Sequence, residues 1–323
     1  MCTAITYQTK DTYFGRTLDL EYLYEEQITV TPRNYRFPFR KEKELCSHYA
    51  IIGMATVAED YPLYYEAVNE KGLAMAGLNF PQNACYFPVQ ENRKNIAVFE
   101  LIPWILCQCE NVTQAKALLK KTNICDSSFS EGFPVSPLHW MIADLECAIT
   151  VESVKDGVKI YNNPVGVLTN NPPFEYHMTH LCDYRNITRD CSKNRFGKIS
   201  LDTYSRGMGA IGLPGDVSSA SRFVRASFVK LNSISGTDEM ESVSQFFHIL
   251  GAVEQQRGCV KLPDGSYELT AYTSCMNLNR GIYYYTTYEN HCISAIDLHR
   301  CNLESDRLIT YPMIREQMLN WLN

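Results

Sequence analysis

The positions of apolar and polar residues predict strands at the N-terminus of the chain. Residues 2–7 and 12–20 are rich in Tyr, Thr, Ile and Phe, which favour strands, and the polar residues "TKDT" separate the two runs. We therefore expect an N-terminal hairpin. Residues 48–57 and 71–81 are further short apolar runs on either side of a turn at 69–72, which predicts more of the sheet.

The hydrophobic period changes between residues 95 and 124. Apolar residues there recur at steps of three and four, which is typical of helices. Asn111 or Thr113 can cap a second helix in this segment, because a short polar side chain accepts a hydrogen bond from the first turn. Pro103 lacks a backbone N–H and is expected to kink or restart the first helix.

Strand patterns return between residues 137 and 170, where the Asp-Gly pair at 156–157 is a good hairpin turn. The stretch 177–206 that follows is polar and less regular.

Two more helices and a closing set of strands are predicted in the last third of the chain. Residues 212–232 indicate a loop leading into a helix with Ser218 or Ser219 as its N-cap, and 240–258 indicate a second helix. Residues 268–298 are then predicted to form successive strands.

The predicted elements follow the order sheet, helices, sheet, helices, sheet. Short turns join neighbouring strands, which implies antiparallel pairing, so an α+β fold with segregated layers is favoured over a doubly wound parallel sheet. The chain contains no linker, low-complexity segment or internal repeat, and we expect residues 1–323 to form a single domain.

Charge and apolar content exclude two classes of partner. Lys and Arg number 30 against 36 Asp and Glu, and no basic block stands out, so nucleic acid is not an expected partner. No run reaches the roughly 18 to 20 apolar residues of a membrane helix, and we expect no membrane insertion. Lys10, Asp11, Arg16 and Asp19 stand where a signal peptide would be apolar, which predicts a cytoplasmic protein.

Cysteine is unusually frequent, with 13 residues scattered along the chain. Their odd number and the length of the chain argue against a disulfide framework. We expect nearly all of them to be reduced, buried and packed as small hydrophobic side chains.

Two patterns have the form of cofactor or metal sites. Gly207, Gly209 and Gly212 match G-x-G-x-x-G, but Pro214 follows at once and no acidic residue stands where a ribose partner belongs, so we do not expect a dinucleotide site.

The metal-like pattern comprises the pair Cys107 and Cys109 and the trio His177, His180 and Cys182. Neither set has the paired spacing of zinc ligands. We interpret them as buried cysteines and surface histidines, and we expect no metal and no organic cofactor.

Cys2 follows directly after the initiator methionine. Methionine aminopeptidase removes Met1 when the next side chain is small, which would leave a free α-amine beside the thiol of Cys2. The amine titrates near about 7.7 to 8.0 and a free thiol near about 8.5, so a modest positive environment favours the reactive thiolate. A nucleophile activated by its own N-terminal amine is an established arrangement for acyl transfer.

Arg16 and Asp19 lie on the second strand of the predicted hairpin. A guanidinium would favour the Cys2 thiolate, and a carboxylate would hold the protonated amine. Side chains three positions apart lie on opposite faces of a regular strand, so we expect a bend or bulge at Gly15 or after it if both reach Cys2. A surface ion pair is the alternative.

Arg222 stands in the first turn of its predicted helix, where the macrodipole disfavours a cation. A nearby anion or thiolate would explain that placement, and an arginine lying along the helix surface is the alternative.

Asn79 in "GLNFP" and Asn170 in "GVLTN" both end an apolar strand just before proline. Strand ends present polar groups to ligands, and an amide can donate to a developing oxyanion. A turn-forming asparagine beside proline is the alternative for each.

The whole chain resembles the choloylglycine hydrolase family, cysteine members of the N-terminal-nucleophile hydrolases, and most of all its bile salt hydrolases. The resemblance is carried by segments in the family's order, from "MCT" and "FGRTLD" through "NEKGLAMAGLNFP", "LHWMIAD" and "GVLTN" to "GLPGDVSSASRF" and "YTSCMNL". The family assignment implies a catalytic set comprising the nucleophile Cys2, Arg16 beside the thiol, Asp19 on the α-amine, the asparagines Asn79 and Asn170 for the oxyanion and substrate orientation, and the second arginine Arg222.

The resemblance also implies a four-layer αββα sandwich, a homotetramer and hydrolysis of glycine- or taurine-conjugated bile salts without a cofactor. Segments 21–28, 51–65 and 83–87 are expected to form walls of an apolar steroid pocket. Penicillin V acylase, of the same family, is the nearest alternative, although it tends to carry an aromatic residue where this chain has Asn79. A cysteine-rich redox or binding module is the alternative from another class.

Overall fold

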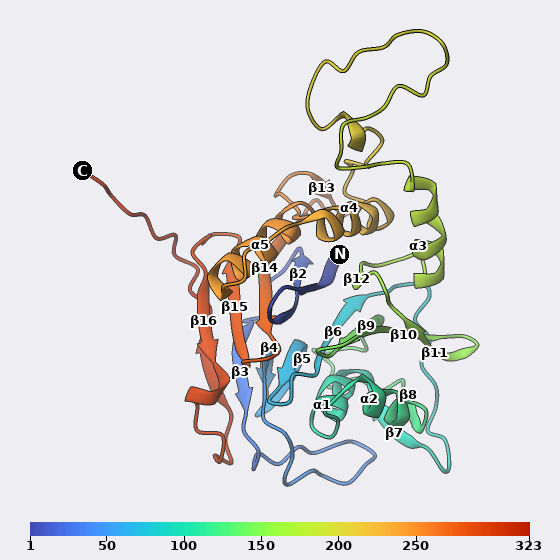
Figure 1. Ribbon diagram of the computed structural model, residues 1–323. Coiled ribbons are helices and arrows are strands. Elements are labelled where there is room, and N and C mark those ends of the chain that lie inside the picture. The colour runs from blue at the N-terminus through green and yellow to red at the C-terminus, as the bar shows by residue number, and fades with distance from the viewer.

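Two β-sheets stacked face to face form the centre of the computed structural model, which describes residues 1–323 (Figure 1). The first sheet has seven strands, six of them in a continuous order. In that order they are β12 (Val167–Leu168), β1 (Cys2–Gln8), β2 (Thr12–Leu20), β14 (Tyr267–Asn277), β15 (Ile282–Thr287) and β16 (Ser294–Asp297), with β13 (Val260–Lys261) paired to β14.

The second sheet has eight strands, and all pairings in both large sheets are antiparallel. Its order is β11 (Gly157–Asn162), β10 (Ala148–Val154), β9 (Leu138–Ala143), β6 (Ala74–Asn79), β5 (Tyr61–Asn69), β4 (Ile51–Ala58), β3 (Gln27–Thr31) and β17 (Ile309–Pro312).

Helices cover the outer face of each sheet (Figure 1). Helices α4 (Ser219–Asn232) and α5 (Glu239–Gly251) contact strands of the first sheet, and α1 (Leu101–Leu106) contacts strands of the second. The remaining helices are α2 (Val112–Leu119), α3 (Phe174–Leu181) and the short 3-10 segments η1 (Val98–Glu100), η2 (Cys182–Tyr184), η3 (Met208–Ala210) and η4 (Leu298–Arg300). The α+β class and the αββα layer order predicted from the sequence are confirmed.

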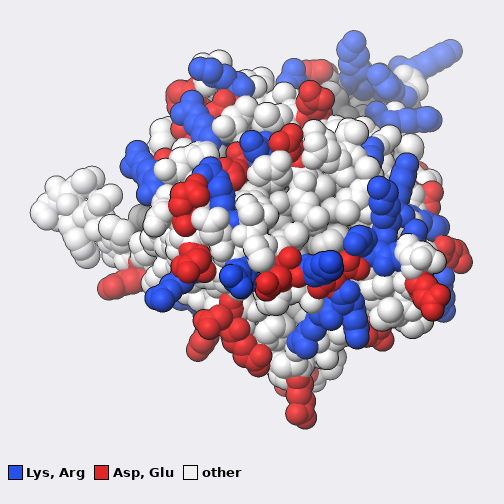
Figure 2. Space-filling model, turned by 90° about the horizontal axis from the view of Figure 1, so that it is seen from below, with Lys and Arg blue, Asp and Glu red and all other residues white.

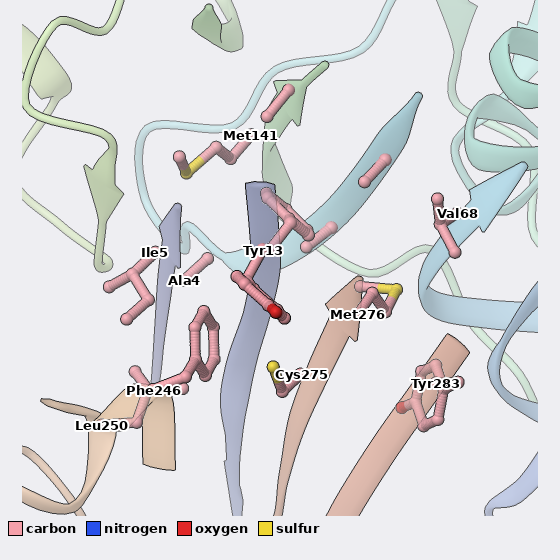
Figure 3. Packing of buried hydrophobic residues seen from close by; sticks show 14 of the residues in the cluster. Ala4, Ile5, Tyr13, Val68, Met141, Phe246, Leu250, Cys275, Met276 and Tyr283 are labelled. Carbon is pink, nitrogen blue, oxygen red and sulfur yellow. The ribbon is translucent and has the colours of Figure 1, made fainter. Parts of the chain in front are cut away.

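Alternation along the strands explains how both faces of the first sheet pack into one hydrophobic core. Ile5 of β1 lies with Phe246 and Leu250 of α5 in the cluster shown in Figure 3, while its neighbour Ala4 points to the other face of the strand. Burial of each large apolar side chain contributes about 1.5 to 3 kcal/mol. Truncation of Phe246 to alanine would cost about 3 to 5 kcal/mol, because the cavity would add to the lost burial.

Several local predictions hold in detail. The hairpin of β1 and β2 pairs Cys2 with Leu18 in regular register. The Asn111 side chain accepts a hydrogen bond from the Gln114 backbone at 3.0 Å and caps α2. Ser218 caps α4 in the same way.

The helical prediction for residues 95–124 is only partly right. The two ends of that segment form β7 (Lys94–Ala97) and β8 (Thr122–Cys125), a parallel two-stranded pair. Pro103 was expected to kink or restart the first helix. Helix α1 begins at Leu101, directly after η1, and holds Pro103 in its first turn, where a residue without a backbone N–H is tolerated. The strands were missed because a four-residue segment is too short for its pattern to separate an extended period from a helical one.

The stretch 177–206 was expected to be less regular, and this is wrong at its start, where α3 runs to Leu181. The chain beyond it extends as a long loop away from the layers (Figure 1). Nearly all cysteines were expected to be buried, and this is also wrong. All 13 are free thiols, but the buried ones are only Cys2, Cys107, Cys109, Cys125 and Cys275.

Charged side chains of both signs mix on the face shown in Figure 2, around an area without charges. No helix has both the length and the apolar character needed to cross a membrane.

Candidate active site

Cys2 is the first residue of β1, and the register of the hairpin fixes which side chains surround it. Cys2 pairs with Leu18 and Ala4 pairs with Arg16, so Cys2 and Arg16 share one face of the first sheet. That face is turned to the second sheet, because the Arg16 guanidinium reaches the Gly77 carbonyl oxygen of β6 at 2.5 Å. The Cys2 side chain is buried with 3% exposure.

Arg16 is held between the two sheets without contact with solvent. Its Nε donates to the Thr17 carbonyl oxygen at 3.1 Å, and the Glu66 carboxylate lies 3.9 Å from the same nitrogen. Burial opposes the charge, but the neighbouring Cys2, Tyr272 and Glu66 outweigh burial and raise the pKa of the guanidinium. The thiol therefore faces a permanent cation, which favours the thiolate.

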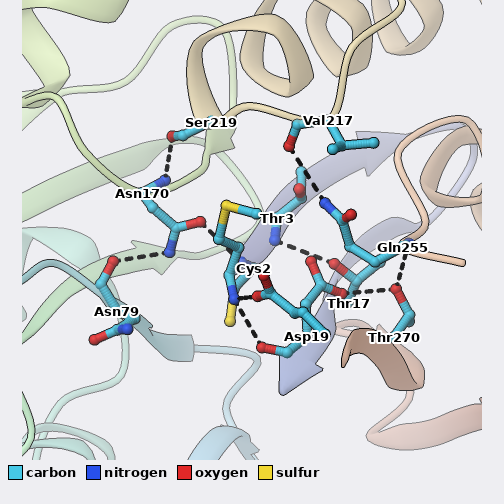
Figure 4. Close-up of polar contacts among 12 residues, drawn as sticks. Cys2, Thr3, Thr17, Asp19, Asn79, Asn170, Val217, Ser219, Gln255 and Thr270 are labelled. Atoms are coloured by element: carbon cyan, nitrogen blue, oxygen red, sulfur yellow. Dashed lines mark hydrogen bonds and ion pairs between the residues drawn. The ribbon is translucent and has the colours of Figure 1, made fainter. Parts of the chain in front are cut away.

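Asp19 lies on the opposite face of β2 from Arg16. Its Oδ1 accepts a hydrogen bond from the Thr270 hydroxyl at 2.7 Å, and its buried Oδ2 has no hydrogen-bond partner (Figure 4). The expected bulge in β2 is absent, since β2 pairs with β1 in unbroken register and the irregularity lies in β14 between Thr270 and Tyr272. A bend is unnecessary because the thiol and the amine are separate groups of Cys2. Arg16 lies on the strand face of the thiol, and Asp19 can approach the amine from the opposite face.

The structure describes the chain with Met1 in place. The Met1 amine donates to the Asp19 carbonyl oxygen at 2.8 Å and forms an ion pair with the Glu268 carboxylate. The Cys2 backbone nitrogen donates to Asn170 Oδ1 at 2.8 Å. The nitrogen that Met1 removal would free therefore already lies against a side-chain acceptor.

Asn170 joins three parts of the site (Figure 4). Besides the Cys2 nitrogen, its Oδ1 accepts from Arg222 Nη2 at 2.7 Å, and its Nδ2 donates to the Asn79 carbonyl oxygen at 2.8 Å. Its own backbone N–H donates to the Ser219 hydroxyl at 2.8 Å. Both ends of the Asn170 amide are thus engaged, which fixes its orientation.

Arg222 is fully buried in the first turn of α4. The alternative of an arginine that lies along the helix surface is therefore wrong. Its Nη1 donates to the Cys2 carbonyl oxygen at 2.6 Å and to Thr3 Oγ1 at 2.7 Å. Burial lowers the pKa of Arg222, and the nearby Asp19 and Cys2 oppose that effect. Oxygen acceptors of β1 and Asn170 thus compensate for its unfavourable position at the helix N-terminus.

Asn79 ends β6 with its side chain exposed, and its backbone carbonyl is the group that contacts Asn170. The structure therefore brings Cys2, Arg16, Asp19, Asn170 and Arg222 together in a buried cluster and places the Asn79 amide at its rim.

No local sequence pattern pointed to the buried histidine that contacts Asn170. His177 was interpreted as a surface residue, and this is wrong: it is fully buried in α3, and its Nε2 lies 2.9 Å from the Asn170 carbonyl oxygen. Burial lowers the pKa of His177 to about 4, so the ring is neutral near neutral pH. A recognised helix at 174–181 would have placed this histidine on the inner face.

The glycine-rich pattern also has a structural role. Gly207 adopts φ 79° and precedes the short segment η3, rather than joining a strand to a helix as a dinucleotide site requires.

The αββα layers and a cysteine at the start of a central strand define an N-terminal-nucleophile hydrolase fold. The profile of the linear amide C-N hydrolases, choloylglycine hydrolase family, matches residues 2–311. The chain belongs to this family, and it is an enzyme of the linear amide hydrolase class.

Relatives with assigned names cover nearly the whole chain. The bile salt hydrolase/transferase of Lactiplantibacillus plantarum is 53% identical over 317 residues, which is 98% of each chain. The bile salt hydrolase/transferase of Clostridium perfringens is 39% identical and covers 100% of both chains.

Solved structures agree with the layer order. The C2A mutant of the conjugated bile acid hydrolase from Clostridium perfringens superimposes with a TM-score of 0.93, at 38% identity and 100% coverage of both chains. Penicillin V acylase from Agrobacterium tumefaciens superimposes with a TM-score of 0.77 at 19% identity, over 98% of this chain and 95% of the other, and shares the fold.

Proposed function

We propose that this enzyme hydrolyses the amide bond between a bile acid and glycine or taurine, with Cys2 as nucleophile after removal of Met1. One observation carries the proposal: the buried Cys2 shares a strand face with Arg16 in a chain 53% identical to a bile salt hydrolase/transferase. We further propose that residues 1–323 act as one catalytic domain.

The first chemical step is attack of the Cys2 thiolate on the amide carbonyl carbon. Arg16 stabilises the thiolate, and the α-amine accepts the thiol proton. Asp19 Oδ2, buried and without a partner, is the acceptor that would hold the amine once Met1 is gone. Asn170 Oδ1 supplies a second acceptor to the same nitrogen.

The attack places negative charge on the former carbonyl oxygen. Asn79 at the rim offers its side-chain amide as a donor to this oxyanion. The Asn170 amide already forms hydrogen bonds with Cys2, Arg222 and Asn79. These contacts suit it to orient the α-amine of Cys2 and to hold Asn79, the proposed oxyanion donor, in place.

Collapse of the tetrahedral intermediate breaks the C–N bond. The α-amine gives its proton to the departing nitrogen of glycine or taurine, and a thioester to Cys2 remains. Water, deprotonated by the same amine, then attacks the thioester and releases the free bile acid. The residues named supply every proton transfer of this route.

A steroid requires an apolar wall beside the nucleophile. Residues 21–26 leave the end of β2 and carry exposed Tyr22, Leu23 and Tyr24, which suits a binding loop. The predicted wall at 51–65 consists of strands β4 and β5 rather than a loop, so its contribution would come from the ends of these strands.

The discriminating experiment incubates the purified enzyme with glycocholate, taurocholate and penicillin V in parallel. We expect release of glycine and taurine, with little phenoxyacetate. Release of phenoxyacetate without cholate would make the enzyme a penicillin V acylase, the alternative within the family. Full amidase activity in Cys2→Ala, or in protein that retains Met1, would support a regulatory thiol instead.

Homotetramer assembly, a cytoplasmic location and independence from cofactors remain predictions. Size-exclusion chromatography with light scattering tests the first, cell fractionation the second, and activity after exhaustive dialysis against a chelator the third.

A further inference from the structure

Glu66 is a buried carboxylate that the proposed reaction does not use. It extends from β5 of the second sheet toward the first sheet and has no exposed surface. Its Oε1 accepts from the Tyr283 hydroxyl at 2.6 Å and its Oε2 accepts from the Tyr272 hydroxyl at 2.8 Å. An isolated buried carboxylate is costly, so this one requires compensation from its neighbours.

The compensating charge is Arg16. Arg16 Nε lies 3.9 Å from Glu66 Oε2, and both side chains are at most 1% exposed. The remaining contacts of Arg16 go to neutral carbonyl oxygens, including those of Thr17 and Gly77. Glu66 is therefore the carboxylate that forms an ion pair with Arg16, and Arg16 is the cation beside the thiol.

We propose that Glu66 is a positioning residue of the active site. Its carboxylate, held by Tyr272 and Tyr283, keeps the Arg16 guanidinium between the sheets and offsets part of the positive charge that Arg16 presents to Cys2. This inference rests on the proposed role of Cys2 as nucleophile.

The balance of charge explains why such an arrangement is useful. Burial raises the pKa of Glu66, while Arg16 and the two tyrosines oppose that shift. A thiolate stabilised too strongly is a weaker nucleophile, because nucleophilicity falls with thiol pKa. The ionisable groups around the thiol that enter this balance are Arg16, Glu66, Tyr272, Tyr283, Asp19, Arg222, Glu268 and the α-amine.

The test measures the pH midpoint of Cys2 alkylation by iodoacetamide in the processed enzyme. The peptide of residues 2–10 ends at Lys10 and contains one cysteine, so tryptic mapping reports on Cys2 alone among the 13 thiols. We expect Glu66→Gln to lower the midpoint by half a pH unit or more, about a threefold change in thiolate fraction below the midpoint. Glu100→Gln is the matched control, since Glu100 is equally buried but accepts from the Ala97 and Arg40 backbones.

A second background shows whether the effect passes through Arg16. In Arg16→Gln the midpoint should rise. Without its cation the buried Glu66 carboxyl should be held protonated, so adding Glu66→Gln should then change the midpoint by less than about 0.2 pH units. An unchanged midpoint in folded Glu66→Gln, or an undiminished shift without Arg16, overturns the inference. If Glu66→Gln does not fold, the Tyr272→Phe and Tyr283→Phe double variant, which weakens the carboxylate, must lower the midpoint for the inference to stand.

Alkylation requires no substrate, so this experiment separates two failures. A midpoint that does not respond to Arg16→Gln contradicts the proposed activation of Cys2. A response to Arg16 without a response to Glu66 contradicts the further inference alone.

Discussion

Arg222 donates a hydrogen bond to the backbone carbonyl oxygen of Cys2 at 2.6 Å, across 220 positions of sequence. Through this contact the first turn of α4 fixes the first residue of β1. The same guanidinium donates a hydrogen bond to the Asn170 side chain, so one buried arginine aligns Cys2, the proposed nucleophile, with Asn170, which we propose orients its amine. Arg222 therefore fixes the positions of Cys2 and Asn170 and also places a buried positive charge beside them.

Replacement of Arg222 by lysine should lower kcat/KM by about 30-fold, equivalent to about 2 kcal/mol. A lysine keeps the charge but cannot bond Cys2, Thr3 and Asn170 at once, because it lacks the planar guanidinium. Steady-state hydrolysis of glycocholate measures the effect. Arg225→Lys, on the same helix and bonded to the Ala252 carbonyl oxygen, is the control. Equal losses in both variants would assign Arg222 to helix stability instead.

Truncation of Asn79 to alanine should lower kcat by about 100-fold to 1,000-fold with little change in KM, since an oxyanion donor acts mainly in the transition state. Asn83→Ala is a nearby control, because the Asn83 amide bonds the Asn171 side chain. A tenfold rise in KM with kcat preserved would contradict the oxyanion role and make Asn79 a substrate-binding group.

Loss of the thiol in Cys2→Ala should abolish turnover while the fold is kept, because the change removes a single sulfur atom from a core cluster of 40 buried residues. Intact mass spectrometry must show the processed N-terminus in the active wild-type enzyme. Cys147→Ala, at an exposed position, should retain full activity. Loss of activity in Cys147→Ala with activity preserved in Cys2→Ala would reverse the assignment of the nucleophile.

Much of this site could be predicted because its residues lie at strand and helix ends with clear local signals. Cys2 and Arg16 belong to a hairpin whose pattern is plain, and Ser218 caps α4 as expected. Once the hairpin register is known, strand alternation alone places Arg16 on the thiol side and Asp19 on the other.

The parts that could not be predicted depend on contacts distant in sequence. Glu66 belongs to the site only because the second sheet packs against the first, and the sequence of its strand does not tell which groups of the other sheet this one charged residue would meet. His177 was misjudged because α3 mixes polar and apolar residues and takes its inner face from packing against α4. Periodicity could not separate the short strands β7 and β8 from the adjoining helices.

Buried His177 should make the free energy of unfolding fall as the pH becomes mildly acidic. Its pKa is lowered to about 4, chiefly by burial, against about 6.5 in an unfolded chain. Between these values the unfolded state binds the extra proton, so stability rises with pH and is lost as the pH falls from about 6.5 to about 4, by about 3 kcal/mol. His177 stacks on Phe223 with ring centroids 4.7 Å apart, so phenylalanine can take its place. In His177→Phe the hydrogen bond to Asn170 is lost, but urea unfolding from pH 4.5 to 7 should show a pH slope flatter than that of the wild type. Parallel slopes in the two proteins would mean that His177 does not carry this proton linkage.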